Sequence, residues 1–220
     1  RYHPIETDSS YTEKQKDRLM KEWWDLYFIL VREHGIDEKE LIKEAKKLGL
    51  PFRKGVKEFF VKLHESSIPA LIFSAGVGNA IEYYLERMKI NTPNIHIISN
   101  RLVFNSKGIL IDFSRPLIHS FNKDERHVKR SAYEKQIAKR KNVILMGDSL
   151  GDLTMANGMK HNCILKIGFL NKEVERNLGE FSEKYDAVIL NDGEFEFINN
   201  VLKEIVHKKK ARLLTCQKKR

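Results

Sequence analysis

We infer the fold outward from one stretch, Val143-Ile144-Leu145-Met146-Gly147-Asp148-Ser149-Leu150-Gly151-Asp152. Its four apolar residues predict a buried strand, and the Gly, Asp and Ser that follow predict a sharp turn into a helix. The turn carries two carboxylates, Asp148 and Asp152. Ligand crevices form at the carboxyl ends of strands in open α/β sheets, and paired acids there suit a hard cation such as Mg²⁺. The alternative is that Asp148 and Ser149 only cap the next helix, which explains one acid but not two acids with two glycines.

The composition is typical of a globular chain, since 41% of the 220 residues are hydrophobic and 32% are charged. This length allows one sizeable core with a smaller appended domain. No apolar run approaches the roughly 20 residues that span a bilayer, and no secretion signal is recognisable at the start, so we expect a cytoplasmic protein without a membrane partner. Cys163 and Cys216 lack both paired metal-ligand spacing and a disulfide framework, and we expect free thiols.

The net charge of +10 comes mainly from the last residues of the chain. Residues 207–220 contain seven Lys or Arg and no acid, which leaves 33 basic against 30 acidic side chains in the rest. We interpret this segment as a basic tail, solvated or docked on acidic partners. No basic stripe is interleaved with aromatic residues as in binders of single-stranded nucleic acids. We therefore expect no nucleic acid partner.

The first fifty residues predict helices after a polar lead segment, residues 1–9. Ser10 and Glu13 have capping-box spacing, and apolar residues then recur at helical period until Gly35. A second helix is predicted from Asp37 to near Gly49, and a third around residues 56–63. We expect residues 10–50 to form a helical cap over a core of residues 51–206.

Strands alternate with helices from residue 68 onward. After a strand at 68–73 and a helix to Met88, the patterns predict strands at 95–98, 143–147, 163–167 and 187–190, a hairpin at 102–111, and helices at 125–140, 150–157, 172–182 and 195–206. This alternation predicts an α/β fold with a doubly wound parallel sheet.

A second polar turn, Ser74-Ala75-Gly76, follows the first predicted strand. The Ser74 hydroxyl and the backbone N–H groups of Ala75 and Gly76 can bind an anion at the start of the next helix, although Ser74 can equally be an ordinary helix cap. Lys123 lies between the hairpin and a helix. A serine at one strand end, a lysine before a helix and two aspartates at the next strand end are what a site needs to hold a phosphate dianion against Mg²⁺.

These residues resemble the motifs of a known family. Residues 73–76, 119–123 and 147–152 are similar to the second, lysine and third motifs of the haloacid dehalogenase superfamily of phosphatases. They resemble more closely the cytosolic 5′-nucleotidase III family, the pyrimidine and 7-methylguanosine monophosphate nucleotidases, from about Arg1 to about Val206. The resemblance implies a Rossmann-like sheet and Mg²⁺-dependent hydrolysis through an aspartyl phosphate. It also implies that Ser74 and the Ala75 N–H bind the phosphate, Lys123 neutralises it, Asp148 ligates Mg²⁺, and Asp152 orients the metal waters.

The family's nucleophile and general acid/base have no counterpart in this sequence. They are two aspartates in an Asp-x-Asp-x-Thr turn after the first, central strand, which in relatives lies upstream of the position that matches Tyr2. The chain begins with Arg rather than Met, so we expect a fragment or processed product that lacks this strand. Because an aspartyl phosphate needs the missing carboxylate, the 220-residue chain is expected to be inactive. Its two neighbouring strands should be unpaired and expose apolar surface.

The resemblance also implies how the base is recognised. Glu6 matches the glutamate that reads the base edge, and Trp24 stands where relatives stack the base; the alternatives are a solvated loop acid and a core tryptophan. A Trp face is the best partner for a cationic ring, and 7-methylguanine is cationic. We therefore expect 7-methyl-GMP as a substrate beside CMP and UMP. Tyr27 departs from the small hydroxyl residue of relatives.

Two other functions stay open from the sequence. One is a phosphatase of the same superfamily for another small phosphate ester, such as phosphoserine. The other is a non-catalytic product that binds a nucleotide through Ser74 and Lys123. For each function we expect a monomer.

Overall fold

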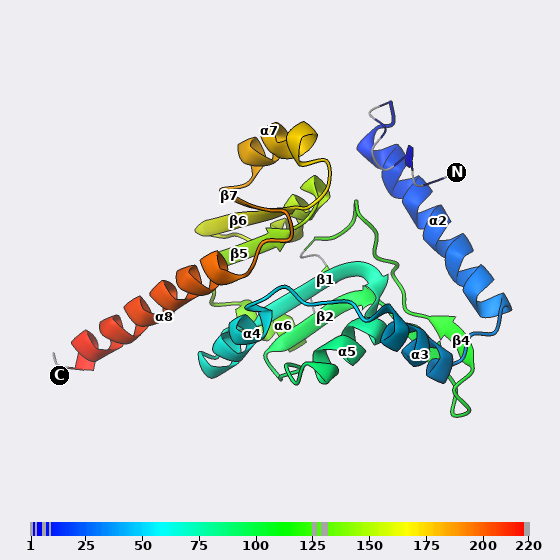
Figure 1. Ribbon diagram of the computed structural model, residues 1–220, viewed down its shortest axis with the longest axis horizontal. Helices are drawn as coiled ribbons and strands as arrows, with labels where there is room; N and C mark the ends of the chain where they lie inside the picture. The colour runs from blue at the N-terminus through cyan, green and yellow to red at the C-terminus, as the bar shows by residue number, and fades with distance from the viewer. Residues whose placement is uncertain are drawn as a thin grey trace.

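The structure is a computed structural model. It describes residues 2, 4–5, 8, 10–124, 127–128 and 132–217, without the side chains of 132 and 209–217. It confirms the α/β class, with parallel strands and helices packed around them (Figure 1). Within the described residues, no helix combines the length and apolar character that crossing a membrane requires.

The elements follow one another along the chain largely as the sequence predicts. In chain order they are α2 (Glu13–Glu33), α3 (Glu38–Leu48), α4 (Val56–Glu65), β1 (Ala70–Val77), α5 (Gly78–Arg87), β2 (Ile95–Asn100), β3 (Leu102–Phe104), β4 (Leu110–Phe113), α6 (Ala132–Ile137), β5 (Asn142–Gly147), the 3₁₀ helix η2 (Leu150–Ala156), β6 (Cys163–Leu170), α7 (Val174–Lys184), β7 (Ala187–Leu190) and α8 (Glu196–Gln217).

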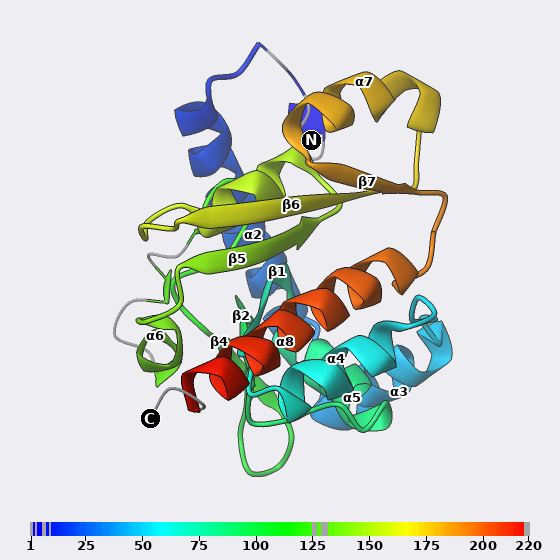
Figure 2. The ribbon, with the colours of Figure 1, turned by 90° about the vertical axis from the view of Figure 1, so that its left-hand side faces the viewer.

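The parallel strands fall into two groups that share one helical layer. β1 pairs with β2, and β5, β6 and β7 pair in that order. Among the described residues no strand pairs with the remaining edge of β1 or of β5. Helices α4 and α8 lie side by side across one face of both groups (Figure 2). A single apolar cluster contains Phe59 of α4 and Ile198 of α8, and Ala70 of β1 and Ile144 of β5 pack against it.

Helix α2 is held away from these sheets by the antiparallel pair β3 and β4. Phe28 is fully buried and its ring stacks on Phe113 with centroids 4.7 Å apart. Arg115 Nη1 donates to Asp25 Oδ1 at 2.7 Å just outside this cluster. Helix α3 instead packs on α5, where the Tyr84 hydroxyl donates to the carbonyl of Ala45 at 2.6 Å. Figure 1 shows α2 as a long rod beside β4.

Two helix starts differ from the sequence predictions. The first helix is capped by Thr12, because Thr12 Oγ1 accepts from the Gln15 N–H while the Gln15 side chain accepts from the Thr12 N–H. Ser10 is not the cap; its own N–H donates to Asp8. The strand that contains Ser74 runs on to Val77, which pairs with Asn100, and α5 begins only at Gly78. Ser74 therefore lies in an irregular strand end and not at a helix start.

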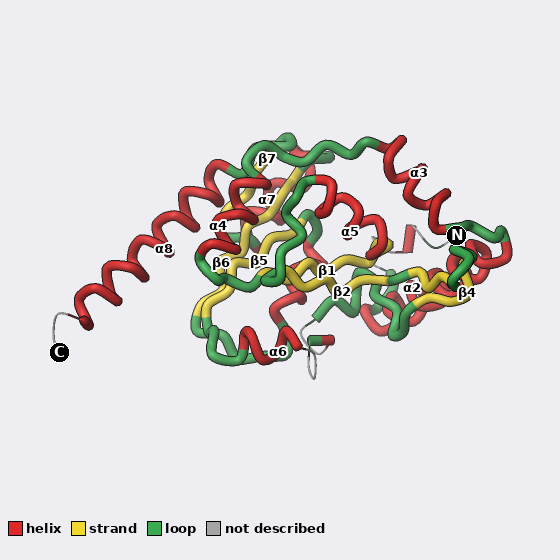
Figure 3. The backbone as a smooth tube through the Cα atoms, turned by 90° about the horizontal axis from the view of Figure 1, so that it is seen from below, coloured by secondary structure: helices red, strands yellow, loops and turns green. Residues whose placement is uncertain are grey.

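Three later elements also differ from the predictions. The turn after Asp148 enters a 3₁₀ helix, because the Asp152 side chain folds back onto the backbone N–H groups that precede it. The helix predicted at 125–140 is represented by α6, and residues 125–126 and 129–131 lie outside the described part of the chain. Helix α8 continues through part of the basic segment to Gln217 and projects beyond the sheets (Figure 3).

Candidate active site

Asp152 is the centre of the polar contacts at the carboxyl end of β5. The residue is 4% exposed, and its Oδ1 lies 2.8 Å from Lys123 Nζ. Its Oδ2 accepts from the N–H groups of Asp148 and Ser149 at 3.0 and 3.1 Å. The close approach requires glycine at 147, because a Cβ there would lie 2.4 Å from that of Asp152. The sequence Gly-Asp-Ser-x-x-Asp thus folds one carboxylate back under the turn.

Asp148 lies beside this buried carboxylate and keeps solvent-exposed surface. Burial of its carboxyl group raises the pKa of Asp148, and the negative charge of Asp152 raises it further, while the Lys123 ammonium opposes the shift. A carboxyl group whose ionised form is disfavoured by burial and by a neighbouring carboxylate provides a favourable position for a cation.

The metal-binding potential of this pair can be judged from its donor set. Within the described ranges, no three His, Cys, Asp or Glu side chains gather to form a metal centre. Mg²⁺ commonly takes only one or two protein carboxylates and completes its six oxygen ligands with water and substrate phosphate. The pair of Asp148 and Asp152 fits that pattern, whereas a structural zinc site would need more protein ligands.

The loop that carries Lys123 is fixed by hydrogen bonds at both of its ends. Asn122 Oδ1 accepts from the His119 N–H at 2.7 Å, and Asn122 Nδ2 donates to the Leu117 carbonyl at 2.7 Å. The Thr154 hydroxyl donates to the Lys123 carbonyl at 3.0 Å. The Lys123 side chain is 15% exposed. Its ammonium group is therefore held against Asp152 with little freedom to move.

Ser74 lies at the neighbouring strand end and belongs to a tight local turn. Its Oγ accepts from the Gly76 N–H at 3.1 Å, so its hydroxyl hydrogen can be donated to a further acceptor. The carbonyl of Ala75 accepts from Asn100 Nδ2 at 2.8 Å, and the same amide group also contacts Ile118 in the lysine loop. The serine turn is thus connected to the lysine loop through one buried side chain.

The two residues predicted to read the base are placed differently. Glu6 lies outside the described residues. Trp24 is partly buried on α2, where its ring stacks on Phe28 at 5.5 Å and meets Tyr27 edge-on at 5.4 Å. At the other end of α2, Asp17 Oδ1 lies 3.5 Å from His119 Nε2. The helix that carries Trp24 therefore contacts the lysine loop directly.

Tyr185 is a site neighbour that the sequence did not indicate. Its hydroxyl donates to the carbonyl of Ser149 at 2.6 Å and so supports the turn that holds Asp148 and Asp152. Burial raises the pKa of Tyr185, and the two nearby carboxylates raise it further, which keeps the hydroxyl protonated as a donor. Gly168 permits this packing, since a Cβ there would lie 2.9 Å from the Tyr185 ring.

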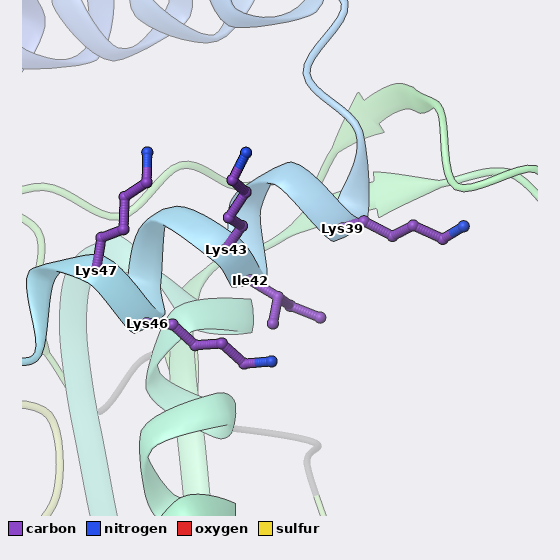
Figure 4. Close-up of a pocket in the computed structure, with 5 residues that line it drawn as sticks. All are labelled: Lys39, Ile42, Lys43, Lys46 and Lys47. Atoms are coloured by element: carbon purple, nitrogen blue, oxygen red, sulfur yellow. The ribbon is translucent and has the colours of Figure 1, made fainter.

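A hollow of about 440 Å³ lies on α3, and its lining includes none of the site residues described above. It is lined by Lys39, Ile42, Lys43, Lys46 and Lys47. Figure 4 shows these ammonium groups spreading outward instead of converging on one point. None of the lining residues offers a carboxylate, hydroxyl or thiol. We therefore place the candidate active site at the ends of β1 and β5 and not in this hollow.

Comparisons with known proteins identify the family of this chain. The family described as Pyrimidine 5′-nucleotidase (UMPH-1) matches residues 1–206. The 7-methylguanosine phosphate-specific 5′-nucleotidase of Homo sapiens is 40% identical over 206 residues, which are 93% of this chain and 69% of the human protein. The Gallus gallus protein of the same name is 38% identical over 206 residues, with 93% and 71% covered. The crystal structure of cytosolic 5′-nucleotidase IIIB bound to cytidine is 34% identical, with a TM-score of 0.84 over 94% of this chain and 71% of that one.

Proposed function

This chain belongs to the pyrimidine 5′-nucleotidase (UMPH-1) family, and on that premise we propose that its site binds nucleoside 5′-monophosphates for hydrolysis to nucleoside and phosphate. Members of this family are phosphoric monoester hydrolases. The substrates that we propose are CMP, UMP and 7-methyl-GMP, because relatives are named for pyrimidine and 7-methylguanosine nucleotides and one was solved with cytidine.

The observation that carries the proposal is the contact between Lys123 and Asp152 beside Asp148. It brings one fixed cation from the lysine loop to two carboxylates at the carboxyl end of β5, where a phosphate and a metal ion are mutually stabilising. Ser74 adds a hydroxyl donor from a turn that is tied to the same loop. In our proposal Ser74 and the Ala75 N–H bind the phosphate oxygens, and Lys123 neutralises the dianion.

Mg²⁺ is the cofactor that we propose, with Asp148 as its ligand and Asp152 as the group that orients its water ligands. When bound, Mg²⁺ neutralises negative charge on the transferred phosphoryl group. Lys123 then has two partners, the Asp152 carboxylate and the phosphate, and its position against Asp152 limits the conformational entropy that phosphate binding costs.

We propose that base recognition comes from the helical segment, residues 10–50, which acts as a cap on a core of residues 51–206. Trp24 offers an indole face for stacking, and Glu6 accepts hydrogen bonds from the base edge. The cation–π contact favours 7-methylguanine over a neutral base. The protein is proposed to be cytoplasmic, by analogy with a relative named as cytosolic, and to act as a monomer.

The first test is calorimetry of the 220-residue chain with CMP and with cytidine in the presence of Mg²⁺. CMP should bind at least about tenfold more tightly, since the phosphate adds contacts worth more than one hydrogen bond. Lys123→Met should abolish this difference, whereas Lys107→Met, which removes an exposed lysine at the hairpin tip, should preserve it. Equal affinity for CMP and cytidine in the unsubstituted chain would contradict the proposal.

Hydrolysis is tested on a fusion in which an Asp-x-Asp-x-Thr segment, of the kind that the family resemblance implies, precedes residue 1. Phosphate release from CMP should depend on Mg²⁺ and exceed release from phosphoserine. Trp24→Ala should raise KM for 7-methyl-GMP more than KM for CMP, because only the methylated base is cationic. An equal rise for both nucleotides would remove the cation–π argument, and faster release from phosphoserine would reassign the substrate.

A further inference from the structure

A buried amide joins the two loops that the proposed phosphate site requires. Asn100 is the last residue of β2, is fully buried, and its side chain forms three hydrogen bonds. Its Nδ2 donates to the carbonyl of Ala75 at 2.8 Å and to the carbonyl of Ile118 at 2.9 Å. Its Oδ1 accepts from the Ile118 N–H at 2.8 Å. We propose that Asn100 is a positioning residue that fixes the serine turn and the lysine loop relative to one another.

The chemistry of the contact explains why an amide is needed. Both polar groups of one backbone residue, Ile118, are bonded to the same side chain, which requires a donor and an acceptor next to each other. The second Nδ2 hydrogen then reaches Ala75 in the other loop. Among neutral side chains only Asn and Gln carry this combination, and the shorter Asn holds its amide closer to the end of β2.

The effect of this contact on Ser74 passes through one peptide group. The Ala75 carbonyl and the Gly76 N–H belong to the same planar peptide. Asn100 holds the carbonyl end, and the N–H end donates to Ser74 Oγ at 3.1 Å. The orientation of this peptide therefore sets the direction in which the Ser74 oxygen points. Without Asn100 the Ala75 carbonyl loses its donor in a partly buried position, and an acceptor left without a partner there is costly, so the turn should reorient.

The effect on Lys123 passes through the lysine loop. Asn100 fixes residue 118, Asn122 ties residues 117 and 119 to the end of the loop, and Lys123 follows directly. The ammonium group then meets Asp152 on the β5 side. Asn100 touches neither the proposed phosphate nor the metal. It acts by fixing the position of the serine turn relative to the lysine loop.

The same pair of strands offers a matched control at its opposite end. Asn94 precedes β2, is half-buried, and its Nδ2 donates to the Ile68 carbonyl at 2.8 Å just before β1. Asn94 thus also links the β1 and β2 segments with an amide. It lies at the amino ends of the strands, away from the candidate active site. A serine in its place should lower stability without changing phosphate binding.

The inference rests on the proposed function, and its test uses binding by the 220-residue chain. Asn100→Ser should weaken binding of CMP and of inorganic phosphate by about tenfold or more, because a misplaced serine or lysine loses at least one hydrogen bond to the phosphate. Its affinity for cytidine should stay within about twofold. Asn94→Ser should leave all three affinities within about twofold. This split between phosphate and nucleoside would not arise from a general loss of structure.

A second measurement on the unsubstituted chain does not depend on a variant that folds. Inorganic phosphate should slow the hydrogen exchange of the Ile118 N–H, whose only route to exchange is the opening of its bond to Asn100, and cytidine should not. Exchange at Ile118 that phosphate leaves unchanged would overturn the proposal. So would an Asn100→Ser chain that binds CMP normally, or an Asn94→Ser chain that loses CMP binding equally. If the unsubstituted chain itself does not bind CMP more tightly than cytidine, that result rejects the proposed function, and the role of Asn100 in phosphate binding is rejected with it.

Discussion

Replacement of Asp152 by Asn tests whether the buried ion pair organises the candidate active site. The substitution keeps the size of the side chain and removes its charge. The new amide oxygen can still accept from the N–H groups of Asp148 and Ser149, which leaves the amide nitrogen facing Lys123 Nζ across the former 2.8 Å contact. Two donors then oppose each other. The Lys123 ammonium must leave its position or remain without a counter-ion.

The magnitude follows from the burial of the two partners. The side chains of Asp152 and Lys123 are 6% and 15% exposed, and loss of one partner of a buried pair costs about 3–5 kcal/mol. Because Lys123 retains some access to water, we expect the lower end, about 3 kcal/mol of unfolding free energy. The double variant with Lys123→Met removes the orphaned charge. It should be more stable than the sum of the two single losses by about 1–3 kcal/mol.

The assay is urea denaturation of the 220-residue chain, followed by far-UV circular dichroism in buffer with a metal chelator. Four proteins form the cycle: the unsubstituted chain, Asp152→Asn, Lys123→Met and the double variant. The slope of unfolding free energy against urea must agree among them for the comparison to hold. A loss below about 1 kcal/mol for Asp152→Asn, or strictly additive losses in the double variant, would refute the reasoning.

Three further predictions concern stability. Gly147→Ala should lower the free energy of unfolding, measured by urea denaturation, by about 1–3 kcal/mol, because its Cβ would lie 2.4 Å from that of Asp152. Gly179→Ala in α7, where a Cβ would meet no atom within 4 Å, should raise it by about 0.5–1 kcal/mol. A reversed order of the two variants would contradict this prediction. Burial lowers the pKa of His96 from its ordinary 6.5, so protons bind the unfolded chain more strongly and stability should fall as pH drops through about 6.5. His96→Phe, which can keep the stack on Tyr133, should flatten that melting-temperature profile. CMP at a hundredfold excess over its Kd should stabilise the chain by about 2.7 kcal/mol, and an equal shift with inosine would oppose a specific site.

The sequence predicts the elements whose signal is local. An apolar run followed by Gly-Asp-Ser gives β5 and its turn, and Asp37 with Gly49 bounds α3 correctly. The sequence predicts one phosphate site that is shared by Lys123, in the loop before a helix, and Asp152, at a strand end, and the 2.8 Å contact brings these two side chains together. The prediction fails where two local signals compete. Ser10 precedes Glu13 and Thr12 precedes Gln15, so both pairs have capping-box spacing. In the structure the capping box forms between Thr12 and Gln15.

The residues that support the site escape sequence analysis for a different reason. Asn100 and Tyr185 bond to backbone carbonyls, and a carbonyl looks the same in every residue of the chain. Their partners Ile118 and Ser149 are 18 and 36 positions away. No periodicity or motif marks such a contact. The same holds for Gly168, whose role depends on an aromatic ring brought close by folding.

The lysine loop has a structural position that explains why binding and stability should be coupled. Through Asn100 it is bonded to the group of β1 and β2, and through Lys123 and Asp152 it is bonded to the group of β5, β6 and β7. These two groups share no strand pairing within the described residues. They are also connected by the apolar layer of α4 and α8 on one face and by a hydrogen bond from Arg140, just before β5, to the carbonyl of Ser67, just before β1. A ligand that engages both loops therefore connects the two groups of strands at their carboxyl ends, so the same contacts that bind phosphate also oppose separation of the sheets.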